Sequence, residues 1–131
     1  MVVITPLFAA IFGLMYMALS LNVVRHRLGT KVSLGDGDNK SLECAIRTHG
    51  NFAEYVPFAL LLLWFIETLT LSANVVFWLG SLLLIARVAH TFGMFYPKSL
   101  IILRQLGVLA TFGVIAMASI SILQHYMPLS I

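Results

Sequence analysis

Four long apolar stretches, each bounded by polar or turn-forming residues, dominate the pattern of hydrophobic and polar positions along the chain. They run near residues 2–24, 43–69, 74–95 and 101–125. A helix needs roughly 20 residues to cross a hydrocarbon core about 30 Å thick, and each stretch is long enough. The pattern therefore predicts an all-α integral membrane protein with four transmembrane helices.

The segments between these stretches predict how the helices connect. Arg25–Leu42 is polar, lacks apolar periodicity and contains the turn-rich run Gly35–Asn39. The links Thr70–Ala73 and Tyr96–Leu100 are short, which favours antiparallel packing of helices that follow one another. We therefore expect a single domain over residues 1–131, folded as an up-down four-helix bundle.

Charged residues are scarce and unevenly placed. Only 10% of the 131 residues are charged and 60% are hydrophobic, so lipid must cover much of the surface. The basic residues of the first and third links are Arg25, Arg27, Lys31, Lys40 and Lys98. Because lysine and arginine concentrate in cytoplasmic loops, we expect both termini on the non-cytoplasmic side. No retention or lipidation signal is evident, which favours a bacterial inner membrane.

The formal net charge of +3 does not indicate nucleic-acid binding. Arg47, Arg87 and Arg104 lie within or at the edge of apolar stretches, whereas a phosphate-binding patch is solvated. The single cysteine, Cys44, cannot form an internal disulfide. No metal site is expected either.

Ionisable residues inside the apolar stretches carry the functional information, because each costs roughly 2.5–3.5 kcal/mol at the centre of an inserted helix. In the second stretch, polar residues at i, i+4, i+7, i+8 and i+11 share one helical face. These residues are Glu43, Arg47, Gly50, Asn51 and Glu54. Arg87 and His90 share a face of the third stretch, and Arg104 begins the fourth.

In an antiparallel bundle these groups fall in the same, cytoplasmic half of the membrane. The set comprises Arg25, Arg47, Asn51, Glu54, Arg87, His90 and Arg104. Arginines bind carboxylates bidentately, while Glu54 can receive an ammonium group and Asn51 an amide. We therefore predict a pocket for a multiply charged, predominantly anionic ligand.

Structural explanations remain open for several of these residues. Arg87 and Glu54 could simply neutralise one another between helices, as intramembrane charges often do. Arg25, Arg27 and Lys31 could be positive-inside anchors without a ligand. The side chain of His49 projects from a different side of its helix and is expected to be a packing histidine.

Three sequence runs resemble a known membrane-protein family. The run Glu43–Pro57, with its Arg-x-His-x-Asn-x-x-Glu core, resembles the second-helix signature of the MAPEG family, membrane-associated proteins in eicosanoid and glutathione metabolism. The run Ala86–Thr91 resembles the third-helix signature, and the corner Arg25–Arg27 resembles the end of the first helix. The resemblance extends over essentially the whole chain.

This resemblance implies a homotrimer that binds glutathione as co-substrate between adjacent subunits, near the cytoplasmic side. The positions that match glutathione ligands are Arg47, Asn51, Glu54 and His90, with Arg87 beside them and Arg25 supplied by the neighbouring chain. Arg104 resembles an arginine that stabilises the glutathione thiolate. A thiol with a pKa near 8.5 becomes mostly thiolate at neutral pH only beside such a cation or donor.

The chain departs from the family pattern at three positions. Gly50 stands where several members have a second arginine, Met94 where a glutathione-binding tyrosine is common, and Val108 near another tyrosine position. In these features it resembles the small bacterial branch of the family.

We therefore expect a membrane glutathione transferase or peroxidase that acts on lipophilic electrophiles or hydroperoxides from the bilayer. The alternative is a non-catalytic binding protein or a small transporter for an anionic ligand. A third possibility is an assembly factor whose polar face holds the oligomer together. In that case Gly80, Gly107 and Gly113 would be points of close helix packing.

Overall fold

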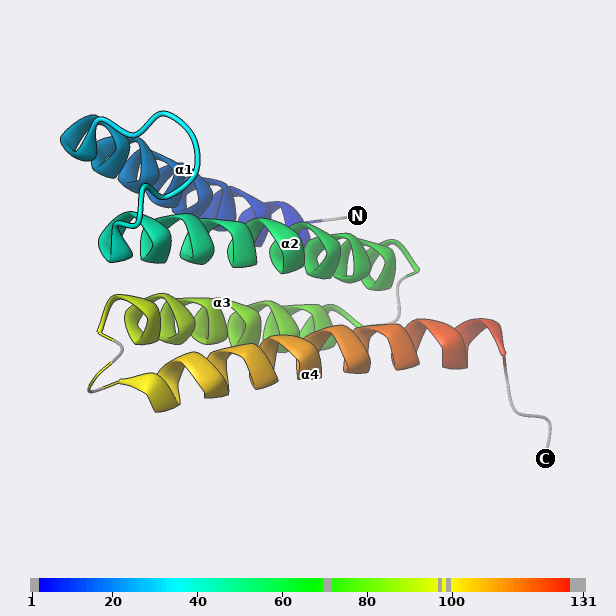
Figure 1. The fold of residues 1–131 in the computed structure, drawn as a ribbon. Coiled ribbons are helices and arrows are strands. Elements are labelled where there is room, and N and C mark those ends of the chain that lie inside the picture. The colour runs from blue at the N-terminus through cyan, green and yellow to red at the C-terminus, as the bar shows by residue number, and fades with distance from the viewer. Residues whose placement is uncertain (1–2, 70–71, 97, 99, 128–131) are drawn as a thin grey trace.

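The computed structural model describes residues 3–69, 72–96, 98 and 100–127 and confirms the all-α fold expected from the sequence. Its helices are α1 (Ile4–Thr30), α2 (Lys40–Thr68), α3 (Ala73–Phe95) and α4 (Ile101–Tyr126). Helices α1 and α2 form one layer and α3 and α4 the other (Figure 1).

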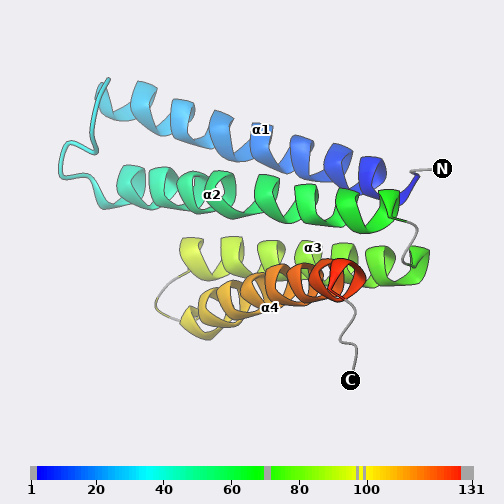
Figure 2. The same cartoon turned by 90° about the vertical axis from the view of Figure 1, so that its right-hand side faces the viewer.

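Successive helices run antiparallel, as the short links predict. The chain turns from α1 to α2 and from α3 to α4 at the same end of the bundle (Figures 1 and 2). We call this the loop end, and it includes Lys31 and Tyr96. Helix α1 begins and α4 finishes at the opposite end, which we call the terminal end. The up-down topology is therefore confirmed.

The outer surface has the apolar character of a membrane protein. Helices α1, α3 and α4 are long and apolar enough to cross a membrane. Large apolar side chains point outwards on all three, such as Leu14, Trp78 and Leu109, each more than 60% exposed. Helix α2 carries more charge, yet it packs against all three of the other helices. We infer that α2 spans the membrane with them.

Two helix boundaries at the loop end differ from the expectation. Helix α1 continues to Thr30 instead of ending near residue 24, and it stops where Lys31 adopts a left-handed φ of 58°. The N–H groups of Lys31 and Val32 donate to the Arg27 carbonyl, which closes the last turn. Helix α2 begins at Lys40 because the Asn39 side chain accepts a hydrogen bond from the Leu42 N–H, 2.9 Å away.

The interior between the layers is mainly aliphatic and aromatic. Phe12 of α1 and Phe52 of α2 pack with ring centroids 6.0 Å apart. Leu63, Leu83 and Val114 extend this core across α2, α3 and α4. The Phe8 ring of α1 lies against Gly80 of α3, where an added Cβ atom would collide with it. The core holds the two layers at a fixed separation.

A carboxylate from α2 caps the start of α1 at the terminal end. No side chain of α1 itself caps this helix. Instead, Glu67 Oε1 accepts the N–H groups of Val3 and Ile4 at 2.6 Å each, and Oε2 accepts that of Thr5 at 2.7 Å. Backbone N–H groups at a helix start have no intrahelical partner, and the helix dipole favours negative charge there. Glu67 therefore has a structural role that the sequence did not reveal.

Candidate functional site

The polar face predicted on α2 lies on the outer surface of the single chain. Arg47 and Glu54 are exposed, and Gly50 and Asn51 between them are half-buried. The α2 side chains that pack inwards, such as Phe52, lie on the opposite side. A long helix in a bundle normally turns its charged residues away from lipid. This face therefore needs cover from outside the chain.

Arg87 of α3 lies on the inner side of the same region and is completely buried. Its Nη2 donates to Asn51 Oδ1 at 2.8 Å, and the guanidinium carbon lies 5.7 Å from the centroid of the Phe52 ring. The Nε and Nη1 atoms have no hydrogen-bond partner among the described residues. Buried donors are costly when unpaired, and nothing among the described residues accounts for these two atoms.

The alternative in which Arg87 neutralises Glu54 is not what the chain adopts. The guanidinium bonds to the amide of Asn51, one turn before Glu54, and Glu54 stays exposed. Asn51 and Glu54 both lie on the polar face of α2, but of these two only Asn51 bonds to Arg87 of α3. A buried cation and an exposed anion are thus left without a shared ion pair.

His90 is buried one turn after Arg87. Its Nδ1 lies 3.4 Å from Arg87 Nη2. A Cβ atom on Gly107 of α4 would collide with the backbone of Ala86 and His90, so α4 contacts α3 directly at this level. The backbone of His90 therefore lies directly against α4.

Arg104 lies one turn before Gly107 and is half-buried. A Cβ atom on Gly93 would collide with the backbone of Arg104, so α3 and α4 also touch at the first turn of α4. These two glycine contacts fix the position of the Arg104 backbone relative to that of His90. Next to it, a groove of about 410 Å³ is lined by Arg104, Gln105, Val108 and Leu109.

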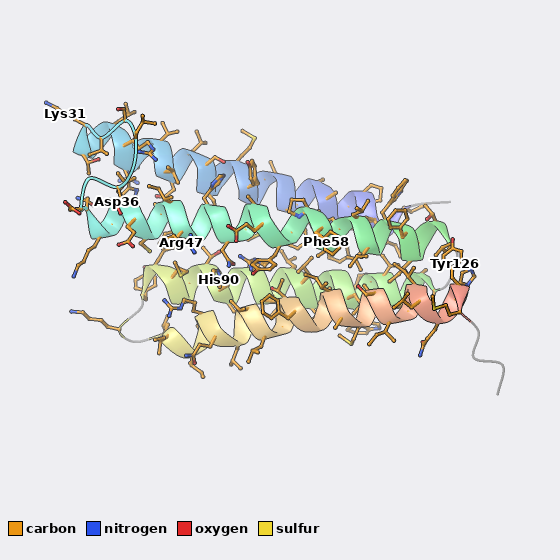
Figure 3. All side chains as sticks on the ribbon, turned by 45° about the vertical axis from the view of Figure 1, so that its right-hand side comes forward. Lys31, Asp36, Arg47, Phe58, His90 and Tyr126 are labelled. Carbon is orange, nitrogen blue, oxygen red and sulfur yellow. The ribbon has the colours of Figure 1, made fainter. Side chains whose placement is uncertain are left out.

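The predicted site residues share one half of the bundle but do not gather in one internal pocket. Figure 3 shows Arg47 and His90 in the half that contains Lys31 and Asp36, far from Tyr126. Arg87 and His90 face inwards, whereas Arg47 and Glu54 face outwards. Within the single chain these two pairs of side chains face different directions, and the shared ligand pocket stays a prediction.

The basic corner at the end of α1 divides into two kinds of residue. Arg25 is exposed. Arg27, in contrast, donates from Nη1 to the carbonyl oxygens of Val32 and Gly35, at 3.3 and 2.9 Å. Arg27 therefore orders the link after α1, a role more specific than the anchor expected from its charge.

The predicted packing role of His49 fits its contacts. Its Nε2 lies 3.0 Å from Ser20 Oγ on α1, and its ring packs against that of Tyr16 with centroids 4.9 Å apart. Cys44 also contacts a neighbouring helix, since its Sγ donates to the Met94 carbonyl at 3.1 Å. Both side chains join α2 to other helices of the same chain.

Sequence reasoning missed one position that shapes the site and one pairing within it. Gly93 permits the contact between α3 and Arg104, and its only signal in the sequence is a small residue in the third apolar stretch. Asn51 was predicted as a ligand, but not as the partner of Arg87. Several polar residues share one face of α2 at i, i+3 and i+4 spacings. Spacing alone therefore could not identify which of them bonds to Arg87.

The sequence also matches known proteins. Residues 5–124 match the MAPEG family. Inner membrane protein YecN from Escherichia coli strain K12 is 38% identical over 90 residues, which cover 69% of each chain, and YecN from strain O6:H1 gives the same values. The match spans all four helices and includes every predicted site residue. The chain is therefore a member of the MAPEG family, membrane proteins of glutathione and eicosanoid metabolism.

Proposed function

We propose that this protein is a membrane-bound, glutathione-dependent enzyme, a transferase or peroxidase that acts on lipophilic electrophiles or hydroperoxides. Membership of the MAPEG family supports the use of glutathione. The chemistry of the loop end supports a ligand that carries both signs of charge. We further propose that the glutathione site lies between copies of this chain, in a homotrimer.

The observation that carries this proposal is the outward polar face of α2. Arg47 and Glu54 are exposed within a helix that packs among three apolar, membrane-length helices. Leaving such charges against lipid costs roughly 2.5–3.5 kcal/mol for each one near the bilayer centre. A second copy of the chain with a charged ligand between the subunits removes that cost. One arrangement would thus account both for the exposed charges of α2 and for the binding of a charged ligand.

Glutathione has groups that suit the residues present. Arg47 and the neighbouring copy's exposed Arg25 would hold its carboxylates, because guanidinium groups pair with carboxylates bidentately. Glu54 would receive its ammonium group. Asn51 and His90 would bind its carbonyl or carboxylate oxygens, and the buried Arg87 would hold Asn51 in place. The ligand would thus neutralise the charges that the chain leaves unpaired.

Arg104 would favour the thiolate of glutathione and so start the reaction. In conjugation, the thiol proton passes to water, the sulfur forms a bond to an electrophilic carbon, and the displaced group leaves with the bonding electrons. In peroxide reduction, the sulfur takes the terminal oxygen and releases an alcohol. A second glutathione then converts the sulfenic acid to a disulfide and water. The groove beside Arg104 offers a place for the lipophilic substrate.

The location follows from the charges and the relative. YecN is an inner membrane protein by name, and we propose the same location for this chain. Lys31, Arg27 and Lys98 lie at the loop end. The positive-inside rule places that end in the cytoplasm and both termini on the other side. Glutathione from the cytoplasm would then reach the polar face directly.

The direct test is to add glutathione to the purified protein in detergent micelles and record the thiolate absorbance. Arg104→Ala removes the proposed thiolate-stabilising cation, and Lys98→Ala removes an exposed cation from the same end as a matched control. We expect a saturable thiolate signal with the wild-type protein and with Lys98→Ala, and its loss in Arg104→Ala. No thiolate signal in the wild type, or an equal signal in Arg104→Ala, contradicts the proposal.

A further inference from the structure

The contacts of Arg87 determine the hydrogen positions on two neighbouring side chains. A guanidinium group carries five N–H donors and no acceptor. The atom of Asn51 that lies 2.8 Å from Arg87 Nη2 must therefore be the carbonyl oxygen, Oδ1. As a result, the Asn51 amide NH₂ is directed away from Arg87.

The same reasoning fixes the state of His90. Its Nδ1 lies 3.4 Å from the same Nη2, and beside a donor this nitrogen must be the unprotonated one. The ring proton is then on Nε2, and the imidazole is neutral. Hydrogen positions on histidine are usually ambiguous, but a partner that can only donate removes the ambiguity here.

Because Arg87 is buried, its side chain stays in contact with Asn51 and His90. The side chain is 0% exposed and lies against the face of Phe52, with the guanidinium carbon 5.7 Å from the ring centroid. Its remaining donors, Nε and Nη1, also lack a partner among the described residues. Arg87 thus contacts both Asn51 and His90 at the junction of α2 and α3.

We propose that Arg87 is a positioning residue that fixes Asn51 and His90 as hydrogen-bond donors, so that this part of the site recognises an acceptor group of the ligand. The acceptor is a carboxylate or peptide carbonyl oxygen. That it belongs to glutathione rests on the proposed function. The inference also sets a limit on His90, because Nδ1 is engaged and Nε2 carries the proton. His90 is therefore a ligand-binding donor and not the base that takes the thiol proton.

Replacing Asn51 by Asp separates positioning from folding. Asn51→Asp keeps an acceptor for Arg87 but removes the donor and adds negative charge towards the ligand. We expect unchanged or higher thermal stability together with at least about a tenfold loss of glutathione affinity in calorimetry. Asn74→Asp makes the same chemical change at the exposed start of α3 and should leave the affinity unchanged. Wild-type affinity in Asn51→Asp overturns the inference.

A second measurement needs no ligand and no stable Asn51 variant. Nitrogen NMR of the histidine-labelled protein, without glutathione, reports the tautomer of each ring, and His90→Gln identifies the His90 signals. We expect the Nε2–H tautomer. A Nδ1–H tautomer or a charged ring overturns the inference. If wild-type protein fails to bind glutathione, the proposed function fails, while the tautomer still decides whether Arg87 positions His90.

Discussion

Two glutamates of α2, Glu67 in its last turn and Glu54 at its midpoint, use their carboxylates in opposite ways. At the terminal end, both oxygens of Glu67 accept backbone N–H groups from the first turn of α1. At the middle of the helix, Glu54 is exposed on the outer surface, and the buried Arg87 bonds to Asn51 instead. One carboxylate completes the fold of the chain, and we propose that the other binds a partner.

This difference gives a physical criterion for function in a membrane helix. When a charged group accepts hydrogen bonds from backbone donors, these bonds offset the free-energy cost of removing the charge from water. Such a group is explained by its role in the fold. A charged group exposed at membrane depth, beside a buried cation with open donors, is unexplained by the single chain. Stability should therefore depend on Glu67 and ligand binding on Glu54.

The largest expected effect is that of Glu67→Gln. The amide keeps one acceptor but loses the charge and directs an NH₂ group at a backbone N–H. Since hydrogen bonds to charged groups are worth about 1.5–3 kcal/mol each, we expect the free energy of unfolding in mixed micelles to fall by about 3 kcal/mol. Asp38→Asn, in the exposed link after α1, is the matched control and should change stability by less than about 0.5 kcal/mol. Equal effects in the two variants would refute the capping role.

The rigidity of the loop end can be tested at Gly107. A methyl group there collides with the backbone of α3 at Ala86 and His90, which cannot move as a side chain can. We expect Gly107→Ala to lower the free energy of unfolding by about 2 kcal/mol, the middle of the range for overpacking. Gly113→Ala is the control, because no atom lies within 4 Å of its added Cβ. Chemical denaturation of both variants should separate them, and a stable Gly107→Ala would show that the contact is absent.

Glu54→Gln sharpens the contrast with Glu67. The side chain is exposed, so we expect stability to stay within about 0.5 kcal/mol of the wild type. Loss of the charge that would receive the ligand ammonium should weaken glutathione binding about tenfold, equivalent to 1.4 kcal/mol. Calorimetry on the purified protein measures both the affinity and the number of sites. A variant that binds normally but unfolds easily would reverse the roles assigned to the two carboxylates.

The smallest expected effect concerns a purely structural contact near the polar face. Ser20→Ala removes the hydroxyl that lies 3.0 Å from His49 Nε2. A net loss of about 1 kcal/mol in the free energy of unfolding is expected for one neutral hydrogen bond. Glutathione affinity should not change, because the contact joins α1 and α2 on the side away from Arg87. A clear loss of affinity would place His49 in the site.

Much of the fold could be predicted from the sequence because lipid imposes simple rules. Apolar stretches long enough to span a bilayer, joined by short polar links, determine the number and direction of the helices. The end of α1 was placed too early, since Arg25 to Thr30 is polar but still helical. A polar end to a transmembrane helix has no hydrophobic signal, and the left-handed Lys31 that stops it has no marker in the sequence.

The close packing of helices was predictable only in part. Gly80 and Gly107 lie against neighbouring helices as expected, whereas the Cβ position of Gly113 is open within the single chain. Gly93 was not singled out, although its contact with Arg104 is at the site. Small residues permit close approach, but their sequence position does not say which side of the helix meets a neighbour.

The chemical residues of the candidate site were found from helical spacing, but their partners were not. Glu67 bonds to the backbone of residues more than 60 positions away. The sequence does not show which backbone N–H groups a distant carboxylate will bind. Arg87 could have paired with Glu54 or Asn51 because both lie on one face of α2. The direction of that face, outwards from the chain, depends on how all four helices pack and could not be read from α2 alone.

The central claim is that the exposed polar face of α2 binds glutathione between copies of the chain. Native mass spectrometry of the detergent-solubilised protein tests the assembly and the ligand together, with Glu54→Gln and Asp38→Asn measured alongside. We predict a homotrimer that retains added glutathione in the wild type and in Asp38→Asn but loses it in Glu54→Gln. A monomer without bound glutathione, or equal retention in all three proteins, would contradict the claim.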